Sequence, residues 1–482
     1  MDFNSIVKKS KVCYNGKVTV RLRISGVQVL QFPSLPGKGI RRTVIIKENF
    51  KMNNAAAAFL GKHNFPIHMD INSVVDAMLF DMNEGLSGRP AAEDMIRTFC
   101  NPPEKAASGE SVIVIDAGGT NFRSCLVTFD QQGKASIDFM EKTSMPGIER
   151  ELNRKEFFDQ FAANLEHLKD KSANIGFCFS YPMTITEDGD GVLIGFSKEI
   201  KAPEVVGCHI GKELAKALSA HGWTKKVNIS LLNDTVAALL AGAACPDDGC
   251  RYSSYIGYIL GTGMNGAYIQ PADPAYKGLK EQIIVCENGK FDKVARSDFD
   301  VEYDRKSVKP GTSILEKMCS GAYLGPVAYE VIHTAASEGL FSDKFSSSLL
   351  KIESLTLIEV DRFLHGPYGT NSILGAKAAE SATPEDYDIL FQLLDAVVER
   401  SARLSAAILT ACVIKSGKGT KSTEPVCILC DGTTFFKTYK IQERVKGYLE
   451  DLLVRQRNLH YQIIERDNDI TLGAAIGGLI KK

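Results

Sequence analysis

Two glycine-rich turns, each entered from a strongly apolar segment, constrain this sequence most. The first lies in VIVIDAGGTNFRSCLV, residues 112–127, where an apolar run ends in an acid and two glycines and then resumes with alternating apolar and polar residues. The second is GTGMNG, residues 261–266, between YIGYIL and AYIQ. Apolar runs of this length beside turn residues predict buried strands. We therefore predict two strand-turn-strand units in different parts of the chain.

The first turn has the composition of a phosphate-binding loop. Glycines at 118 and 119 permit positive φ and leave backbone N–H groups uncovered, which allows a loop to cradle phosphate oxygens. Thr120 and Asn121 add side-chain donors, and Arg123 adds positive charge. Asp116 can approach a phosphate-bound Mg2+ directly or through water. An ordinary type I′ or II′ hairpin explains the same residues, so both interpretations stay open at this point.

The second turn formally matches GxGxxG. A dinucleotide fingerprint requires a helix directly after the glycines, whereas here AYIQ continues as a strand. The sequence therefore disfavours a Rossmann site. Two similar turns after apolar strands instead indicate one nucleotide held between two similar halves.

The rest of the chain predicts an α/β protein. Helical periodicity over 152–171, 211–222 and 233–244 alternates with apolar strands over 174–180 and 226–232. Beyond residue 310 the pattern is mainly helical, with a long helix over 386–414, and strands return at 424–432 and near 461. Near the N-terminus, KVTVRLRISGVQVLQF alternates like a hairpin, and nothing there continues into the downstream pattern.

Composition limits the partners. A chain of 482 residues exceeds the size at which one core usually stops growing, so two domains are expected. The net charge of −1 gives no basic excess, so we expect no nucleic-acid or membrane partner but a small molecule. The start lacks the apolar core of a signal peptide, and no apolar run reaches the ~18 residues of a spanning helix. These features predict a cytoplasmic protein.

The cysteines form no recognisable framework. Only Cys427 and Cys430 make a CxxC pair, and no second pair or nearby histidine completes a zinc site. We expect two buried thiols on an apolar strand, in a reducing compartment.

Loops at strand ends carry the remaining polar candidates. Asp234 stands where a strand ends and a helix begins, so it is explained as an N-cap. The same helix dipole favours an ionised carboxylate, which is a proton acceptor. Ser180, Ser197 and Lys198 lie in loops after strands, where α/β proteins place ligands.

Taken together, these segments resemble the eukaryotic-type hexokinase family of the actin-like ATPase superfamily. The resemblance spans roughly residues 65–480, as one hexokinase unit, and rests on the order of DAGGTNFR, GFCFSYPMT, FSKEIKAP, LLNDT, LGTGMNGAY, CENGKFD, PGTSILEKMCSGAYLG, CDGTT and TLGAAIGGL. It implies a two-lobed, ribonuclease H-like α/β fold with a cleft between the lobes. The implied small domain comprises 104–232 plus 466–482 and the large domain 53–103 plus 233–465, after an N-terminal extension of uncertain role over 1–52.

The resemblance also implies roles for individual residues. Asp234 takes the proton of the sugar's 6-hydroxyl, with Lys198 as a second catalytic residue. The sugar is bound by Ser180, Ser197, Lys198, Asn233, Asp234, Asn265, Glu287 and Glu316. ATP is bound by the two turns, with Mg2+ at Asp116 and the adenosine beside Gly432 and Thr433. The nucleotide-binding set is Asp116, Gly118, Gly119, Thr120, Asn121, Arg123, Gly261, Thr262, Gly263, Gly432 and Thr433.

The chain departs from the family pattern at two places. Ser197, Lys198 and Glu199 stand where Thr-Lys-Gly is usual, and Pro326 stands where an acidic residue usually follows SGxYLG. Neither change removes a residue of the expected chemical centre. They bear on sugar preference and loop motion.

The predicted activity is transfer of phosphate from ATP to the 6-hydroxyl of a hexose, giving hexose 6-phosphate and ADP, the first step of glycolysis. Glucose is the first candidate, with fructose and mannose as alternatives. Two other functions compete: a hexose sensor or regulatory homologue that binds without turnover, and another actin-like ATPase with a chaperone or filament role. The actin-like ATPase alternative assigns no function to the FSYP and NDT segments.

Overall fold

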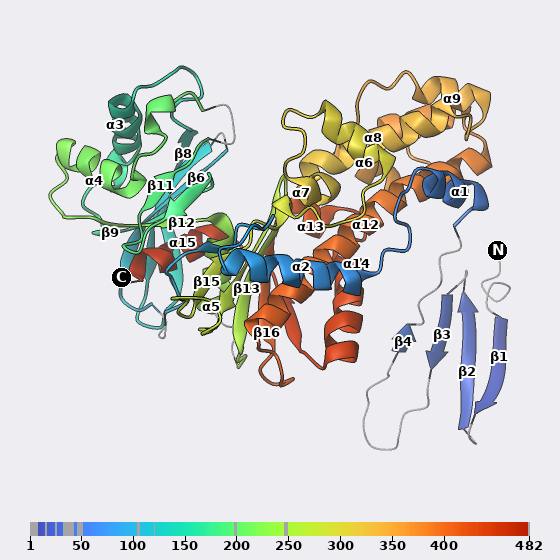
Figure 1. Cartoon of the computed structure of the whole chain (residues 1–482), viewed down its shortest axis with the longest axis horizontal. Coiled ribbons are helices and arrows are strands. Elements are labelled where there is room, and N and C mark those ends of the chain that lie inside the picture. The colour runs from blue at the N-terminus through green and yellow to red at the C-terminus, as the bar shows by residue number, and fades with distance from the viewer. Residues whose placement is uncertain are drawn as a thin grey trace. The chain divides into compact units, whose positions relative to one another are not determined.

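A computed structural model gives the architecture of the chain (Figure 1). It describes the backbone of four strands near the N-terminus and residues 52–480 apart from 104–106, 120, 197–199 and 245–248. The chain divides into two compact units, Met1–Asn54 and Ala55–Lys482.

The first unit contains a four-stranded antiparallel sheet in the order β1-β2-β3-β4. Its strands are β1 (Lys8–Tyr14), β2 (Lys17–Ile24), β3 (Val27–Gln31) and β4 (Thr43–Ile45). The antiparallel pairing of β2 with β3 confirms the hairpin predicted from the alternating residues.

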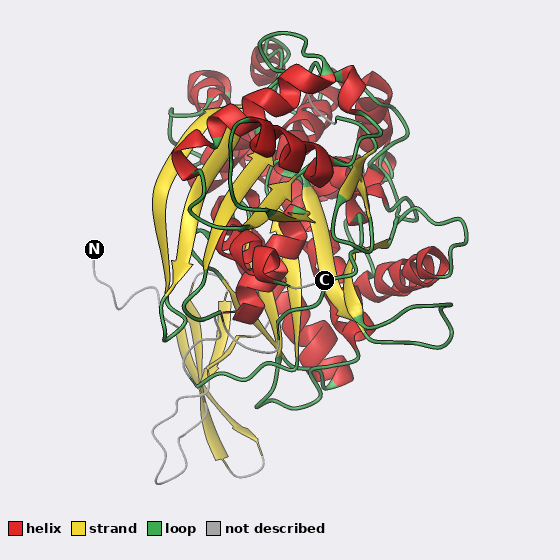
Figure 2. Ribbon diagram, turned by 90° about the vertical axis from the view of Figure 1, so that its left-hand side faces the viewer, coloured by secondary structure: helices red, strands yellow, loops and turns green. Residues whose placement is uncertain are grey.

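The second unit contains two larger sheets with helices on both sides (Figure 2). The five-stranded sheet has the order β12-β9-β6-β7-β8, formed by β6 (Ser111–Gly118), β7 (Asn121–Phe129), β8 (Ala135–Ser144), β9 (Asn174–Phe179) and β12 (Asn228–Leu232). Strands β6, β9 and β12 are parallel, and β6, β7 and β8 form an antiparallel meander. The six-stranded sheet has the order β17-β16-β13-β14-β15-β5, formed by β5 (Ile96–Arg97), β13 (Ser254–Leu260), β14 (Met264–Gln270), β15 (Gln282–Val285), β16 (Val426–Asp431) and β17 (Tyr461–Ile464).

A pair of helices joins the two sheets. Helix α15 (Asp469–Leu479) packs on the five-stranded sheet, and α5 (Asp234–Ala244) packs on α15 and on β13. The contacts are too close for side chains, because a Cβ on Gly176 would lie 1.8 Å from Ala474 O and one on Gly473 would lie 1.7 Å from Ala237 O. These close approaches tie α15 to β9 of the five-stranded sheet and to α5.

The outer layers are helical, as predicted beyond residue 310. Helices α3 (Arg154–Asn164) and α4 (Ile210–Ala220) accompany the five-stranded sheet, with the short strands β10 (Met183–Ile185) and β11 (Gly191–Leu193) nearby. The other helices are α1 (Asn54–Lys62), α2 (Ile71–Leu86), α6 (Asp298–Lys306), α7 (Ile314–Cys319), α8 (Gly321–Ser337), α9 (Asp343–Leu349), α10 (Leu357–His365), α11 (Ile373–Ser381), α12 (Pro384–Ser416), α13 (Thr433–Lys437) and α14 (Ile441–Leu449).

The long helix α12 begins and ends where its sequence dictates. Thr383 caps its start in a reciprocal capping box with Asp386, and Pro384 occupies the first turn, where its missing N–H costs no hydrogen bond. Gly417 ends the helix at φ 63°, a conformation that glycine adopts without strain. The helix buries an apolar face that includes Leu393 and Ile408.

Cys427 and Cys430 lie on β16 and are both buried, which confirms the interpretation of the CxxC pair. Burial raises the pKa of the Cys430 thiol well above its usual range. Ten cysteines of the described residues are free thiols.

Candidate active site

The first predicted turn joins β6 and β7 as a hairpin. Asp116 lies opposite Arg123 in the register, and Arg123 Nη1 lies 3.4 Å from Asp116 Oδ2. Gly119 has φ 67°, a left-handed conformation that glycine adopts without strain. The positive φ predicted for this turn is therefore present. Asn121 pairs with Gly118 at the end of the ladder. Thr120 lies outside the described residues.

Ser180 lies against this turn. Its backbone N–H donates to Ala117 O at 3.2 Å, and a Cβ on Gly118 would lie 3.3 Å from Ser180 Oγ. The neighbouring Tyr181 hydroxyl donates to Gly119 O at 2.8 Å. A predicted sugar-binding hydroxyl and a predicted phosphate loop therefore lie side by side. Ser197, Lys198 and Glu199, by contrast, fall outside the described residues.

Asp234 begins helix α5, and this corrects one expectation. The cap is Asn233, whose Oδ1 accepts from Thr235 N at 2.9 Å and also contacts the Thr235 hydroxyl. Asp234 is the first helical residue and accepts from the same Thr235 N–H at 2.8 Å. Asn233 is one residue closer to the strand, so its side chain has the usual N-cap span to the second helical N–H. Asp234 is consequently not needed as the cap.

The environment of Asp234 is that of a proton acceptor near neutrality. Burial raises its pKa to about 6, although the hydrogen bond from Thr235 N acts in the opposite direction. The charges of Glu287, Asp116 and Asp431 also raise the pKa, so these carboxylates are close enough to interact with it. A carboxylate of this pKa is ionised at neutral pH and retains useful basicity.

The second predicted turn joins β13 to β14, and the strand that follows confirms that no dinucleotide fingerprint is present. Two of its carbonyl oxygens accept hydrogen bonds from the start of α8. Gly321 N donates to Gly261 O at 2.8 Å, and Ala322 N donates to Thr262 O at 3.1 Å. The Thr434 hydroxyl also donates to Gly261 O, at 2.9 Å. The start of α8 and α13 thus hold the turn in place.

The predicted adenosine residues adjoin this second turn. Gly432 has φ 111°, and a Cβ there would lie 2.3 Å from Leu260 O. A Cβ on Gly261 would in turn lie 3.7 Å from the Gly432 Cα. Thr433 begins α13 and is exposed. All of the described nucleotide-binding candidates therefore gather around the ends of β6, β13 and β16.

The predicted sugar carboxylates lie beside the second turn. Glu316, on α7, accepts from Met264 N at 3.3 Å, and a Cβ on Gly263 would lie 2.5 Å from its Oε1. Glu287 accepts from Asn265 Nδ2 at 2.7 Å, while its own N–H donates to Asn265 Oδ1 at 3.0 Å. Burial raises the pKa of both carboxyls, and the charge of Glu287 adds to the effect on Glu316.

Two acidic residues near the centre were missed as site candidates. Asp431 ends β16 opposite Ile259, and its charge raises the pKa of Asp116 and Asp234. Asp469 begins α15, where burial raises its pKa to about 7 with a further contribution from Asp431. Asp431 was visible in the CDGTT segment, whereas nothing local in the sequence distinguishes Asp469 from a helix-start residue.

The site offers limited ligands for a metal. Among the residues that the structure describes, no group of three or more His, Cys, Asp or Glu side chains is arranged to hold an ion. Asp116 has the chemistry for Mg2+, because its half-buried carboxylate lies near the charge of Asp431 and a cation offsets that repulsion. Mg2+ typically uses one or two carboxylates together with waters and phosphate oxygens, which fits a site of this kind.

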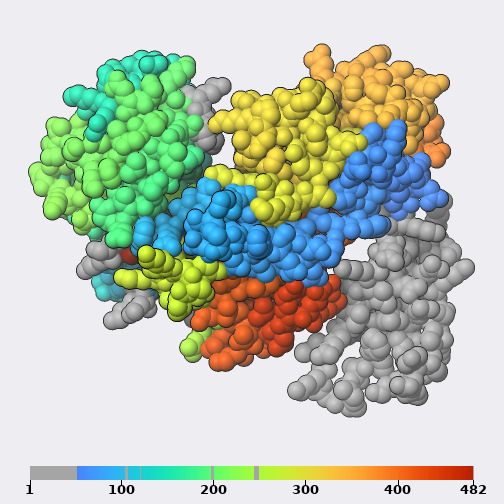
Figure 3. All heavy atoms as spheres, viewed as in Figure 1, coloured from blue at the N-terminus to red at the C-terminus, as the bar shows by residue number. Residues whose placement is uncertain are grey.

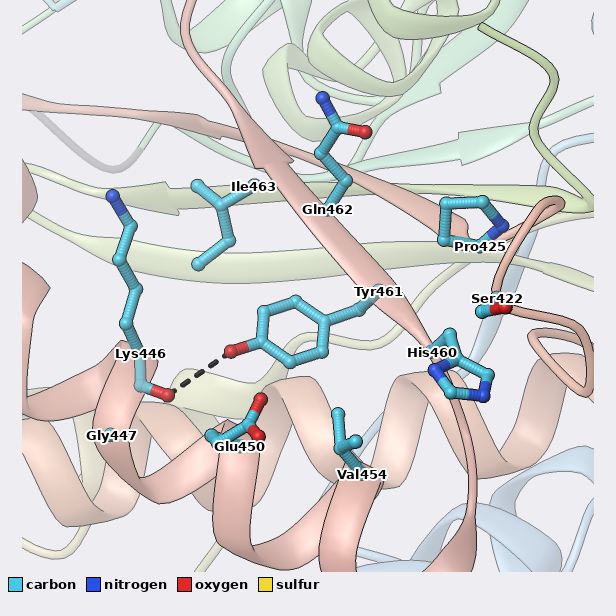
Figure 4. Close-up of a pocket in the computed structure, with 10 residues that line it drawn as sticks. All are labelled: Ser422, Pro425, Lys446, Gly447, Glu450, Val454, His460, Tyr461, Gln462 and Ile463. Atoms are coloured by element: carbon cyan, nitrogen blue, oxygen red, sulfur yellow. Dashed lines mark hydrogen bonds between the residues drawn. The ribbon is translucent and has the colours of Figure 1, made fainter. Parts of the chain in front are cut away.

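A pocket of about 630 Å³ lies away from all of these residues, between α14 and the edge strand β17 (Figure 4). Its Tyr461 hydroxyl donates to Lys446 O at 3.0 Å. None of its lining residues is a predicted site residue or belongs to a glycine turn. The space-filling view instead shows a hollow between the green and the yellow parts of the surface, which contain α4 and α7 respectively (Figure 3). We therefore place the candidate site by its chemistry rather than by pocket size.

Comparisons with known proteins identify the family of the chain. Two family profiles described as hexokinase match the chain, one over residues 63–244 and the other over residues 255–480. Hexokinase-5 of Oryza sativa subsp. japonica is 30% identical over 418 residues, covering 80% of this chain and 81% of its own. The chain belongs to the hexokinase family. Hexokinase-1 of Spinacia oleracea is 26% identical over 508 residues, covering 99% and 96% of the two chains.

Solved hexokinases share the fold. A hexokinase from Schistosoma mansoni, complexed with glucose, aligns with a TM-score of 0.69 at 23% identity and covers 88% of this chain and 98% of its own. A second hexokinase crystal structure aligns with a TM-score of 0.73 at 21% identity, covering 89% and 100% of the two chains. The predicted resemblance and the predicted two-lobed actin-like α/β fold are both confirmed.

Membership of the hexokinase family identifies this chain as a kinase that acts on sugars. Of the two departures from the family pattern, Pro326 lies inside α8, which continues through it to Ser337. It leaves Glu316 and the second turn in place. In the described part of the chain, no helix combines the length and apolarity needed to cross a membrane.

Proposed function

We propose that this protein transfers the terminal phosphoryl group of ATP to the 6-hydroxyl of a hexose, with glucose as the first candidate. The observation that carries the proposal is the position of Asp234. It begins a helix between two strand-end turns, and its pKa is raised by burial and by carboxylates from both sheets. The product, hexose 6-phosphate, is that of the first step of glycolysis.

Asp234 acts as the general base in this proposal. Its ionised carboxylate accepts the proton of the 6-hydroxyl as the oxygen attacks phosphorus, and the neighbouring negative charges increase its basicity. Asn233 supports this role, since it supplies the cap acceptor for Thr235 and so fixes the start of α5. Proton transfer then needs no movement of the helix.

In this proposal the sugar is held from both sheets, by a hydroxyl on one side and by an amide and two carboxylates on the other. Ser180 comes from the five-stranded sheet, while Asn265, Glu287 and Glu316 surround the second turn. Carboxylates accept hydrogen bonds from several hydroxyls at once, which suits a polyol. We extend the set to Asn233, Ser197 and Lys198, and propose that the Lys198 ammonium offsets charge on the transferred phosphoryl group.

The phosphates of ATP are held by the two turns. Backbone N–H groups near Gly118, Gly119, Gly261 and Gly263 and the side chains of Thr120, Asn121 and Thr262 supply donors, with Arg123 as a fixed positive charge. Gly432 and Thr433 flank the nucleoside. Positioning and charge stabilisation supply most of the catalysis in phosphoryl transfer. Backbone N–H groups, side-chain donors and an arginine are groups of the kind that this reaction needs.

Asp116 holds Mg2+, directly or through water, in this proposal. When bound, the ion neutralises charge on the phosphate oxygens. Arg123 Nη1 lies 3.4 Å from Asp116 Oδ2, so the guanidinium partly offsets the charge of the carboxylate when no cation is bound.

We also propose that two domains close over the substrates. We propose a small domain of 104–232 plus 466–482 and a large domain of 53–103 plus 233–465, which meet near Asp234. A hexose that contacts both domains stabilises the closed state by the difference in its affinity for the two states. Closure excludes water, which otherwise competes with the sugar as acceptor.

A coupled assay of hexose-dependent ADP release tests the proposal. Glucose, fructose, mannose and glucosamine are supplied in parallel with MgATP, and the expected result is release with at least one of them. Binding of a hexose without ADP release would support a sensor instead. ADP release that no hexose stimulates would support another actin-like ATPase.

A further inference from the structure

Glu93 is a fully buried carboxyl that the proposed reaction does not use. It lies between α2 and β5, and its side chain is 0% exposed. Asp81 of α2 anchors this segment, since its Oδ2 accepts from Ala92 N at 2.9 Å and from Glu93 N at 2.8 Å. The position of Glu93 is therefore fixed by its own backbone.

The pairing of β5 with β15 brings Glu93 close to the segment that contains Glu287 and Asn288. Ile96 lies opposite Val285 in the register, and Met95 N donates to Cys286 O at 3.4 Å. The chain on either side of this contact continues to Glu93 and to Asn288. The register thus places a buried carboxyl beside the residue that follows Glu287.

Glu93 and Asn288 share one hydrogen bond. Asn288 Nδ2 donates to Glu93 Oε1 in a short hydrogen bond, and both side chains are completely buried. The two atoms left over, Glu93 Oε2 and Asn288 Oδ1, are buried and have no hydrogen-bond partner among the described residues. A carboxylic acid and a primary amide can form two parallel hydrogen bonds, and a proton on Glu93 would supply the donor that Asn288 Oδ1 lacks.

We propose that Glu93 is a positioning residue for the sugar site: uncharged, it pairs through both oxygens with the amide of Asn288 and so holds Glu287 in place. This inference rests on the proposed role of Glu287 in binding the hexose. Glu93 itself touches no substrate.

The surroundings of Glu93 favour the protonated form. Burial raises its pKa to about 8, with a further contribution from the charge of Asp81, while the hydrogen bond from Asn288 and the charge of Lys293 act in the opposite direction. Lys293 already contacts Asp81 Oδ1. The other titratable neighbours, Cys286 and Tyr268, have pKa values raised well above their usual range by burial and are uncharged.

Asn288 follows Glu287 directly in the chain, so fixing the Asn288 side chain also restrains the backbone of Glu287. Glu287 has φ 59°, a conformation that costs a non-glycine residue free energy and persists only where its neighbours fix it. On one side Asn265 bonds both its N–H and its carboxylate, and Gly266 N donates to the same Asn265 Oδ1 at 2.8 Å. On the other side, Asn288 bonds Glu93, next to the Met95–Cys286 backbone bond and the contact of Lys290 with Asp94. Ionised Glu93 cannot form the second bond and repels Asn288 Oδ1. The restraint on the Glu287 backbone is then weaker.

The test compares the wild type with Glu93→Gln and Glu93→Met. Glutamine places an N–H where the acid has its O–H, so it keeps both hydrogen bonds and cannot ionise; methionine fills the volume without either bond. Glucose binding is measured by calorimetry, without ATP, from pH 7 to pH 9. If only the protonated form binds well, the wild-type Kd rises about tenfold, since one pH unit above the pKa leaves about a tenth of the protein protonated. Glu93→Gln is expected to change less than twofold over this range, and Glu93→Met to bind several-fold more weakly at pH 7.

A second measurement reads the proton directly. The infrared difference spectrum of wild type minus Glu93→Gln at pH 7 is expected to contain the carbonyl stretch of a protonated carboxylic acid, and this band should disappear by pH 9. Absence of the band at pH 7, or a Kd that follows the same pH course in wild type and Glu93→Gln, would overturn the inference. If no variant binds glucose, fructose or mannose at any pH, the proposed function fails and the positioning role fails with it, while the band still decides whether the buried pair is neutral.

Discussion

Replacing Asp234 by asparagine should make the protein more stable and nearly inactive. Asparagine keeps an Oδ1 that can accept from Thr235 N, now 2.8 Å away, so the start of α5 is preserved. It cannot accept the proton of the 6-hydroxyl. General-base catalysis contributes about 10²–10⁴-fold, so kcat should fall by roughly 100-fold or more with little change in sugar affinity.

The stability gain follows from the pKa of Asp234. Burial raises the pKa from its usual 3.8 to about 6, so the folded state disfavours the ionised form. The wild type therefore loses stability as pH rises from about 4 to about 6 and stays at the lower level above that range. Asparagine has no such loss. At pH 7 the gain should be about 2–3 kcal/mol, because one pKa unit corresponds to ~1.4 kcal/mol.

Two measurements check the Asp234→Asn prediction, namely steady-state kinetics with calorimetric sugar binding, and urea unfolding at pH 4 and pH 7. The matched control is Asp188→Asn, at an exposed position, where hydrogen bonds from Thr186 and Lys212 lower the pKa of the aspartate to about 2. That control should keep wild-type kcat and gain no stability. If Asp234→Asn retains more than half of the wild-type kcat, the base assignment is wrong. If it is less stable than wild type at pH 7, the electrostatic description of the site is wrong.

Four further predictions follow from the same geometry. In the wild type, kcat/KM should fall as pH drops through about 6, because protonated Asp234 accepts no proton; a profile flat to pH 5 would contradict this. Thr262→Val should raise the KM for ATP roughly 5- to 10-fold, the worth of one hydrogen bond, with little effect on sugar binding; unchanged ATP kinetics would count against the two-turn model. Gly432→Ala should cost about 1–3 kcal/mol in urea unfolding, because φ is 111° and the new Cβ would lie 2.3 Å from Leu260 O. Glucose should reduce the radius of gyration in small-angle scattering, and Glu316→Ala should diminish this change; a bound but uncompacted protein would exclude closure.

The local sequence predicted the parts of the site that depend on short-range chemistry. The two turns, the strands that enter them and the thiols of β16 followed from apolar runs and turn residues, because a buried strand and a tight turn are each specified within a few positions. The error at Asp234 has a local cause too. Asn233 and Asp234 are both good caps, and only the geometry of the strand end decides which one caps.

Features that depend on distant pairings were beyond the sequence. The influence of Asp431 on Asp234 arises because β16 lies beside β13, and the pairing of Glu93 with Asn288 arises from the register of the two-residue strand β5. A strand that short has no detectable periodicity. Glu93 therefore gave no signal as a site residue, although its burial and its neighbours make it one of the most perturbed carboxyls of the molecule.

The most direct test of the proposed activity is the stoichiometry of the products. The wild type is incubated with γ-phosphate-labelled MgATP and one hexose, and ADP, labelled hexose 6-phosphate and free phosphate are quantified together. We expect one hexose 6-phosphate for each ADP, almost no free phosphate, and loss of both products in Asp234→Asn. ADP with free phosphate but no sugar phosphate would contradict this expectation, and so would an absence of ADP with every hexose that the protein binds.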